Sequence, residues 1–196
     1  MNQEQIAPRT RRTPRADVRA GILEAAATVF ADQGFAATSV DQVAAAAGFS
    51  KGAVYSNFAG KDELFFAILE QRSATRARLA AEAEDARTVG RGLAEAHDAD
   101  PAWIVLLIEF WTHALRDAAL RERLEEHRAP LRAEIARAID DLAAREGRQL
   151  PLPAEDLAVA AIAMTNGLTM ERTADGAPGA TLLPRILPLL FGEVTR

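Results

Sequence analysis

The chain has 196 residues, a formal net charge of -5 and no cysteine. This length allows one large core or a small domain joined to a larger one, and the lack of cysteine excludes disulfides and thiolate chemistry. Hydrophobic residues make up 49% and charged residues 26%, which is typical of a globular protein. Because no signal-like segment or membrane-length apolar run is found, we expect a soluble, cytoplasmic protein.

Positive charge is concentrated near the N-terminus. Residues 1–61 carry 7 basic and 5 acidic side chains, whereas residues 62–196 carry 16 basic and 23 acidic ones. Only the N-terminal third therefore suits DNA, whose phosphates require Lys and Arg. Arg9, Arg11, Arg12 and Arg15 precede the first predicted helix in a Thr- and Pro-rich tail. Residues 1–14 are expected to form a disordered basic arm, which either contacts DNA or only aids solubility.

Three short-range patterns predict three helices before residue 61. Apolar residues at three- and four-residue steps predict a helix over residues 16–33, ended by Gly34. Ser39, followed three residues later by Gln42, forms a capping-box pattern at the start of a second helix. Gly48 ends this helix, and Ser50 caps a third. The predicted buried face of the first helix consists of Ile22, Leu23, Ala26, Val29 and Phe30.

The rest of the chain also has helical periodicity. We expect a long connecting helix from Lys61 to about residue 84, a short helix within residues 88–101, and further helices over 102–115, 120–145, 154–172 and 182–191. In the last of these, Pro184 fits a first turn, whereas Pro188 must kink or end the helix. The predicted fold class is all-α, with a helix-turn-helix domain over residues 15–61 and a larger C-terminal domain over residues 62–196.

Residues 39–58 have the form of a helix-turn-helix, in which the second helix enters the major groove of DNA. Gly52 and Ala53 have little bulk to keep the backbone away from a duplex, and Lys51 can reach a guanine edge or a phosphate. Backbone amides at the helix start can donate to a phosphate. The predicted DNA-contacting residues are Thr38, Ser39, Gln42, Ser50, Lys51, Gly52, Ala53, Tyr55, Asn57 and Lys61.

One sequence pattern extends over this region. It consists of the run Thr38-Ser39-Val40-Asp41-Gln42-Val43-Ala44, the run Ala47-Gly48-Phe49-Ser50-Lys51-Gly52-Ala53-Val54-Tyr55, and then Phe58, Lys61 and Leu64. This pattern resembles the DNA-binding signature of the TetR/AcrR family of transcriptional regulators. This family usually has histidine where the chain has Asn57, and valine where it has Phe49. The resemblance implies a homodimer that reads a pseudo-palindromic operator, with one recognition helix per half-site. It also implies a repressor that a small-molecule effector releases from DNA.

One motif offers an enzymatic alternative. Gly48-Phe49-Ser50-Lys51-Gly52 fits the nucleophile elbow of a serine hydrolase, with Ser50 as nucleophile. That elbow requires a preceding buried strand, yet an alanine-rich helical segment precedes Ser50. The three histidines lack the spacing of metal ligands, and no cofactor motif is present. We therefore expect no enzyme, metal or cofactor, and keep two alternatives: a hydrolase using Ser50, and a small-molecule-binding protein without DNA activity.

In the C-terminal domain, polar residues interrupt two apolar helices. On the first, Trp103 and Phe110 are candidate pocket walls, and Glu109 or His113 would orient an effector. On the second, Met164, Asn166 and Met170 are candidates for the same cavity. The alternative is a packed aromatic core beside a solvated polar stripe, with methionine as core filler.

The segment over residues 182–191 is too apolar to remain in water, so it must be buried within the subunit or against a partner. By resemblance to TetR-type regulators, we assign it together with residues 154–172 to a dimer interface, in which these helices pair across a two-fold axis. The sequence does not identify the effector, the operator or the regulated genes.

Overall fold

The computed structural model describes residues 14–100, 102–175 and 179–192. All regular elements in these ranges are helices, which confirms the all-α prediction. They are α1 (Arg15–Gln33), α2 (Val40–Ala47), α3 (Lys51–Tyr55), α4 (Lys61–Glu82), α5 (Ala86–Asp98), α6 (Ala102–Ala114), α7 (Ala118–Arg145), α8 (Ala154–Asp175) and α9 (Gly179–Leu190).

The first three helices begin and end where local signals predict. Gly34 ends α1 with φ +78°, and Gly48 ends α2 in the left-handed conformation with φ +70°. Both parts of the predicted capping box are present, since Ser39 Oγ accepts from Gln42 N and Gln42 Oε1 accepts from Ser39 N. The predicted buried face of α1 is confirmed at all five positions.

Arg15 was expected just before the first helix but is the first residue of α1, where its side chain contacts the end of α3. Residues 1–13 of the predicted basic arm lie outside the described residues.

The prolines of α9 do not mark its start and end, as the sequence had suggested. The helix begins at Gly179, so Pro184 lies in its interior and not in its first turn, and Pro188 is followed by two more helical residues. Pro130 lies within α7 as well. Proline removes one backbone donor and crowds the preceding turn, but the packing of these helices against their neighbours outweighs that cost.

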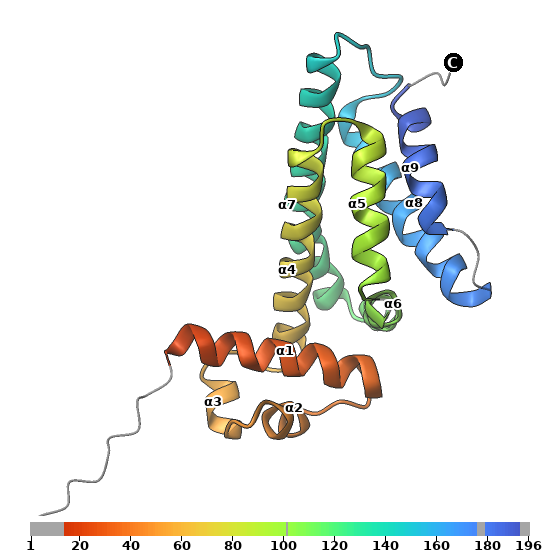
Figure 1. Cartoon of the computed structure of the whole chain (residues 1–196). Helices are drawn as coiled ribbons and strands as arrows, with labels where there is room; N and C mark the ends of the chain where they lie inside the picture. The colour runs from red at the N-terminus through yellow and green to blue at the C-terminus, as the bar shows by residue number, and fades with distance from the viewer. Residues whose placement is uncertain (1–13, 101, 176–178, 193–196) are drawn as a thin grey trace, which may run out of the picture.

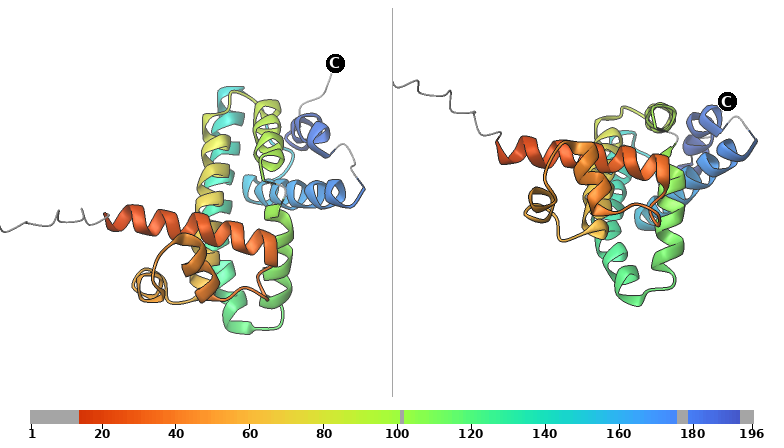
Figure 2. Two further views of the ribbon diagram at one scale, coloured as in Figure 1. Left: turned by 60° about the horizontal axis from the view of Figure 1, so that its bottom comes forward. Right: turned by 90° about the horizontal axis from the view of Figure 1, so that it is seen from below.

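Figure 1 shows α1, α2 and α3 gathered at one end of the molecule, with α4 and α7 running side by side away from them. Figure 2 shows α8 and α9 side by side at the edge of the helical domain. The first turns of α4 and the buried face of α6 belong to the same hydrophobic cluster as α1, α2 and α3. A second cluster joins α5, α7, α8 and α9. Hydrophobic packing therefore continues past residue 61, the boundary expected between the domains.

Helices α5 and α9 approach unusually closely at Gly90. A Cβ atom at this position would lie 2.6 Å from the backbone N of Pro184. At this distance a side chain at position 90 would clash with backbone atoms of α9, and backbone atoms cannot rotate away as a flexible side chain can. The missing side chain of Gly90 thus allows α9 to lie directly against α5.

Candidate functional site

The turn between α2 and α3 is fixed by a glycine and a serine. Gly48 supplies the left-handed conformation that other residues adopt only at an energetic cost. Ser50 Oγ then accepts a hydrogen bond from Ala53 N at 3.2 Å, which caps the short helix α3. Val54 and Phe58 are buried and hold α3 against the rest of the domain. The outward orientation of α3 therefore follows from its caps and its two inward apolar residues.

The outer surface of α3 presents small and polar side chains to solvent. Tyr55 is 50% exposed, a large value for an aromatic residue. Lys51 and Gly52 are exposed as well, and a Cβ atom at Gly52 would meet only Ser50 Oγ, at 3.9 Å. Ala53 is half-buried. A duplex could thus approach the backbone of α3 closely, with one cation and one aromatic hydroxyl beside it.

Lys51 is paired across the turn with Asp41 of α2. The Nζ of Lys51 lies 2.7 Å from Asp41 Oδ1, and both side chains are well exposed. The hydrogen bond and charge of Asp41 raise the pKa of Lys51 above its usual value. Since exposed ion pairs contribute little stability, a phosphate or a base edge can replace Asp41 as the partner of Lys51.

Asn57 forms part of the connection between α3 and α1. Its amide Nδ2 donates to Ala53 O at 2.8 Å, and Arg15 donates to Ser56 O at 3.1 Å and to Asn57 Oδ1 at 3.5 Å. This position therefore contributes to the internal structure of the domain. Its predicted role as a phosphate contact stays a prediction.

Three other predicted DNA contacts form internal hydrogen bonds. Thr38 is buried, and its hydroxyl donates to Gly34 O at 2.7 Å. Lys61 Nζ donates to the carbonyls of Phe35 and Ala36 at 2.7 and 3.1 Å. Gln42 closes the capping box with Ser39 and donates to Gln33 at 2.7 Å. The side chain of Thr38 is only 3% exposed, and its predicted contact with DNA stays a prediction.

The hydrolase alternative for Ser50 does not fit the structure. The element before the turn is helix α2 and not a buried strand, and Ser50 Oγ serves as a helix cap. A nucleophile elbow needs the strand in order to expose its serine on a sharp bend. Within the described part of the chain, no group of three or more His, Asp or Glu side chains could hold a metal ion.

The seven candidate effector residues do not meet in one cavity. Phe110 is fully buried and stacks on Phe65 with ring centroids 3.6 Å apart, and Trp103 packs in the same aromatic core. Glu109 and His113 line an open groove beside the α1–α2 loop. Trp103 and Phe110 pack against Phe65 of α4 in the first hydrophobic cluster, whereas Met164 of α8 packs against the second. This corrects the expectation of a single site.

The three α8 candidates differ in their surroundings. Met164 packs partly buried against the second core, as the core-filler alternative predicted, whereas Met170 is exposed. Asn166 accepts a hydrogen bond from Arg76 of α4, with 3.4 Å between Oδ1 and Nη1. Asn166 therefore adjoins a different cavity, which involves α4, α5, α7, α8 and α9.

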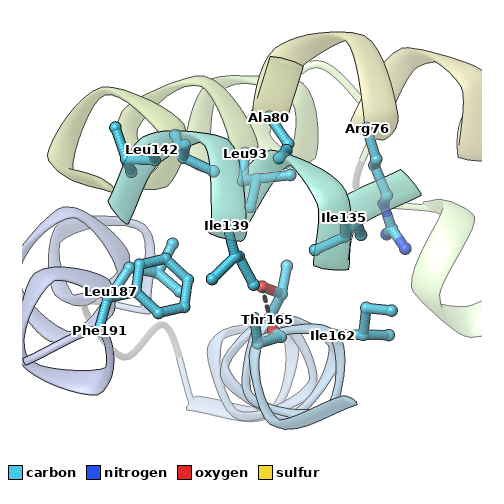
Figure 3. Close-up of a pocket in the computed structure, with 13 residues that line it drawn as sticks. Arg76, Ala80, Leu93, Ile135, Ile139, Leu142, Ile162, Thr165, Leu187 and Phe191 are labelled. Carbon is cyan, nitrogen blue, oxygen red and sulfur yellow. Dashed lines mark hydrogen bonds between the residues drawn. The ribbon is translucent and has the colours of Figure 1, made fainter. Parts of the chain in front are cut away.

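This cavity lies between the helices of the second core (Figure 3) and contains about 570 Å³ of space free of protein atoms, some of it open to solvent. Eleven of its thirteen lining residues are apolar, and the two polar ones are Arg76 and Thr165. Burial, together with the nearby charges of Arg72 and Arg128, lowers the pKa of Arg76 to about 10. Arg76 was missed by sequence reasoning because it is one of several arginines on a charged helix.

The outer faces of α8 and α9 carry exposed apolar side chains. Val159 is 51% exposed, and Met170 and Leu189 are exposed to a similar degree. Ala163 and Gly167 lie between Val159 and Met170 at four-residue steps and are exposed too. Residues at this spacing share one face of a helix. The second core therefore leaves a small-residue apolar stripe uncovered on the segments assigned to a dimer interface.

Comparison with known proteins agrees with this architecture. Residues 22–68 match the family model "Bacterial regulatory proteins, tetR family", and residues 82–186 match "BetI-type transcriptional repressor, C-terminal". The second match alone covers more than half of the chain. The protein belongs to the TetR family of bacterial regulators, with an N-terminal helix-turn-helix domain and a larger C-terminal helical domain.

The individual proteins that the chain matches are distant from it in sequence. The repressor AcnR of Corynebacterium diphtheriae is 30% identical over 115 residues, which is 58% of each chain. Among solved structures, a TetR-family regulator from Rhodococcus sp. is 25% identical with a TM-score of 0.75, covering 90% of this chain and 100% of the other. FadR of Bacillus subtilis in complex with stearoyl-CoA has a TM-score of 0.70 at 15% identity, covering 90% and 99%. The chain spans 29% to 66% of the length of the curated relatives that it matches.

None of the described helices is long and apolar enough to cross a membrane.

Proposed function

We propose that this protein is a sequence-specific DNA-binding transcriptional regulator that represses its target by binding a pseudo-palindromic operator as a homodimer. The observation that carries the proposal is the outward presentation of Lys51, Gly52 and Tyr55 on a helix held by Ser50 and Val54. A helix of this kind can lie in the major groove while its N-terminal amides face the phosphates.

The apolar stripe of α8 and the exposed Leu189 of α9 support dimerisation. Exposed apolar surface at this spacing is stabilised by burial against a second copy. A two-fold axis between the α8–α9 pairs would make the interface isologous and place one recognition helix on each half-site. Half-sites one helical turn apart, roughly 34 Å, would then be read together.

A small-molecule effector is the third part of the proposal. The cavity between α4, α5, α7, α8 and α9 is the candidate site, since it is apolar and enclosed by helices of the C-terminal domain. The structurally similar FadR of Bacillus subtilis was solved with stearoyl-CoA, which supports a ligand site in this fold. An effector that binds better to a conformation with displaced recognition helices would release the operator.

Selection of bound sequences from a random pool of duplex DNA tests the proposal. The full chain without ligand should enrich an inverted repeat, and its affinity for that repeat should fall steeply with salt. Enrichment of a single half-site without symmetry would remove the dimeric mode of binding. Failure to enrich any sequence would leave the alternative of a small-molecule-binding protein without DNA activity.

A further inference from the structure

The lining of the cavity contains one cation in apolar surroundings. Thr165, the other polar lining residue, donates its hydroxyl proton to Ala161 O at 2.7 Å, so this donor is used within α8. The guanidinium of Arg76 is therefore the main polar feature of the cavity. Of its five N–H donors, one makes a hydrogen bond within the described residues, to Asn166 at 3.4 Å.

Arg76 also lacks the carboxylate partner that one other arginine of α4 and one of α7 have. Arg72 forms an ion pair with Asp100, and Arg132 forms one with Glu125. None of the carboxylates in the described ranges forms an ion pair with Arg76. The like charges of Arg72 and Arg128 also act on it and lower its pKa. The charge of Arg76 is thus not paired with a carboxylate of the described residues.

An uncompensated cation in apolar surroundings is costly, since it loses hydration without gaining a counter-charge. A bound anion would supply that counter-charge and could accept two hydrogen bonds from the planar guanidinium. A cationic ligand would instead be repelled by Arg76. The positive charge of Arg76 therefore favours a negatively charged ligand.

The shape of the cavity indicates the rest of the ligand. Figure 3 shows Arg76 at one end of the lining and Leu187 and Phe191 at the opposite end, with Ile139 between them. The apolar side chains that bound the space are all aliphatic except Phe191. A linear apolar chain suits such a space better than a bulky ring system, with its polar head at the end that holds Arg76.

We propose that the effector of this protein is an anionic amphiphile, with a carboxylate or phosphate head bound by Arg76 and an unbranched apolar chain directed towards Leu187 and Phe191. This inference rests on the proposed function in one respect, namely that the C-terminal domain binds an effector. The carboxylate and the phosphate share the chemistry that Arg76 recognises, and the choice between them is made by experiment.

Four ligands that share a ten-carbon chain but differ in the charge of the head group are compared for binding to the unmodified protein. Decanoate, decyl phosphate, 1-decanol and decyltrimethylammonium are titrated by calorimetry into the full chain, each below its micelle-forming concentration. At least one of the two anions should bind about tenfold or more tightly than the alcohol, and the ammonium should bind most weakly.

Two variants assign the preference to Arg76. Arg76→Met removes the charge but keeps a long side chain that suits an apolar wall, and it should weaken anion binding by about 10- to 100-fold while leaving 1-decanol within about threefold. Arg78→Met is the matched control, because Arg78 is an exposed residue of the same helix outside this cavity. It should leave the ranking of all four ligands unchanged.

The proposal would be overturned if the four ligands bound with equal affinity, or if the ammonium compound bound most tightly. An anion preference that is unchanged in Arg76→Met would overturn it as well. Absence of binding by all four ligands would overturn it too. DNA selection with the unliganded protein is independent of these titrations. An enriched operator combined with a failed ligand series would therefore refute the ligand class alone.

Discussion

Glu109 of α6 accepts a hydrogen bond from the backbone N–H of Phe35, with 2.6 Å between Oε2 and N. Lys61 of α4 donates to the carbonyl of the same residue at 2.7 Å. Both polar backbone groups of Phe35 are thus satisfied by side chains of α4 and α6. The loop between α1 and α2 is therefore a point where these two helices hold the helix-turn-helix in position.

Replacing Glu109 with Ala should destabilise the protein. The half-buried N–H of Phe35 would lose its acceptor, which typically costs about 1–3 kcal/mol. Urea unfolding followed by circular dichroism measures the change, and Glu126→Ala, at an exposed position of α7, is the control that should change stability by less than about 0.5 kcal/mol. Equal stability of the two variants would show that the Glu109 contact does not hold the loop.

Replacing Gly90 with Ala should separate α5 from α9. Its Cβ would lie 2.6 Å from backbone atoms of Pro184, so one helix must shift, at an expected cost of about 1–3 kcal/mol. Gly92→Ala is the matched control on the same helix, because its Cβ would meet the flexible end of Leu79 at 3.1 Å. Thermal unfolding distinguishes them. A melting temperature for Gly90→Ala equal to that of Gly92→Ala would contradict the close helix contact.

Replacing Val159 with Arg should prevent dimerisation. A charge on the apolar stripe of α8 would be buried without a partner in the proposed interface. Val105→Arg is the control, since Val105 of α6 is exposed to a similar extent, 46% against 51%. Sedimentation at micromolar concentration should give a monomer for the first variant and a dimer for the second. A dimer in both cases would place the interface elsewhere.

Replacing Asp41 with Asn should strengthen DNA binding by roughly three- to tenfold at low salt. The variant removes a carboxylate that repels phosphates and frees Lys51 from its ion pair. The pKa of Lys51 should fall towards its usual value, and the amine stays protonated at neutral pH. Fluorescence anisotropy with the selected operator measures the affinity. Asp140→Asn on α7 is the control, and an affinity for Asp41→Asn no higher than that of this control would refute the expected competition.

Much of the N-terminal domain was predictable because its signals are local. Ser39 with Gln42, Gly48 and Ser50 each act within four residues, and the caps that they form are present in the structure. The buried face of α1 follows directly from apolar periodicity. Exposure of Lys51 and Tyr55 follows from the inward positions of Val54 and Phe58.

The C-terminal site was less predictable because it depends on contacts between distant segments. Trp103 and Phe110 have the composition of pocket walls, yet they pack against Phe65 and the α1–α2 loop. What distinguishes Arg76 from Arg72 and Arg78 is its placement beside residues of α7 and α8, from Ile135 onward, which are at least 59 residues later in the chain. No periodicity on α4 alone reveals this placement.

The most direct test of the central claim is the affinity of Lys51→Ala and Tyr55→Ala for the selected operator, compared with Arg137→Ala at an exposed cation of α7. Each of the first two variants should lose about 10- to 100-fold in affinity while remaining dimeric, and Lys51→Ala should also reduce the steepness of the salt dependence. Arg137→Ala should bind like the unmodified protein. Unchanged affinity in both α3 variants would contradict the claim that α3 is the recognition helix.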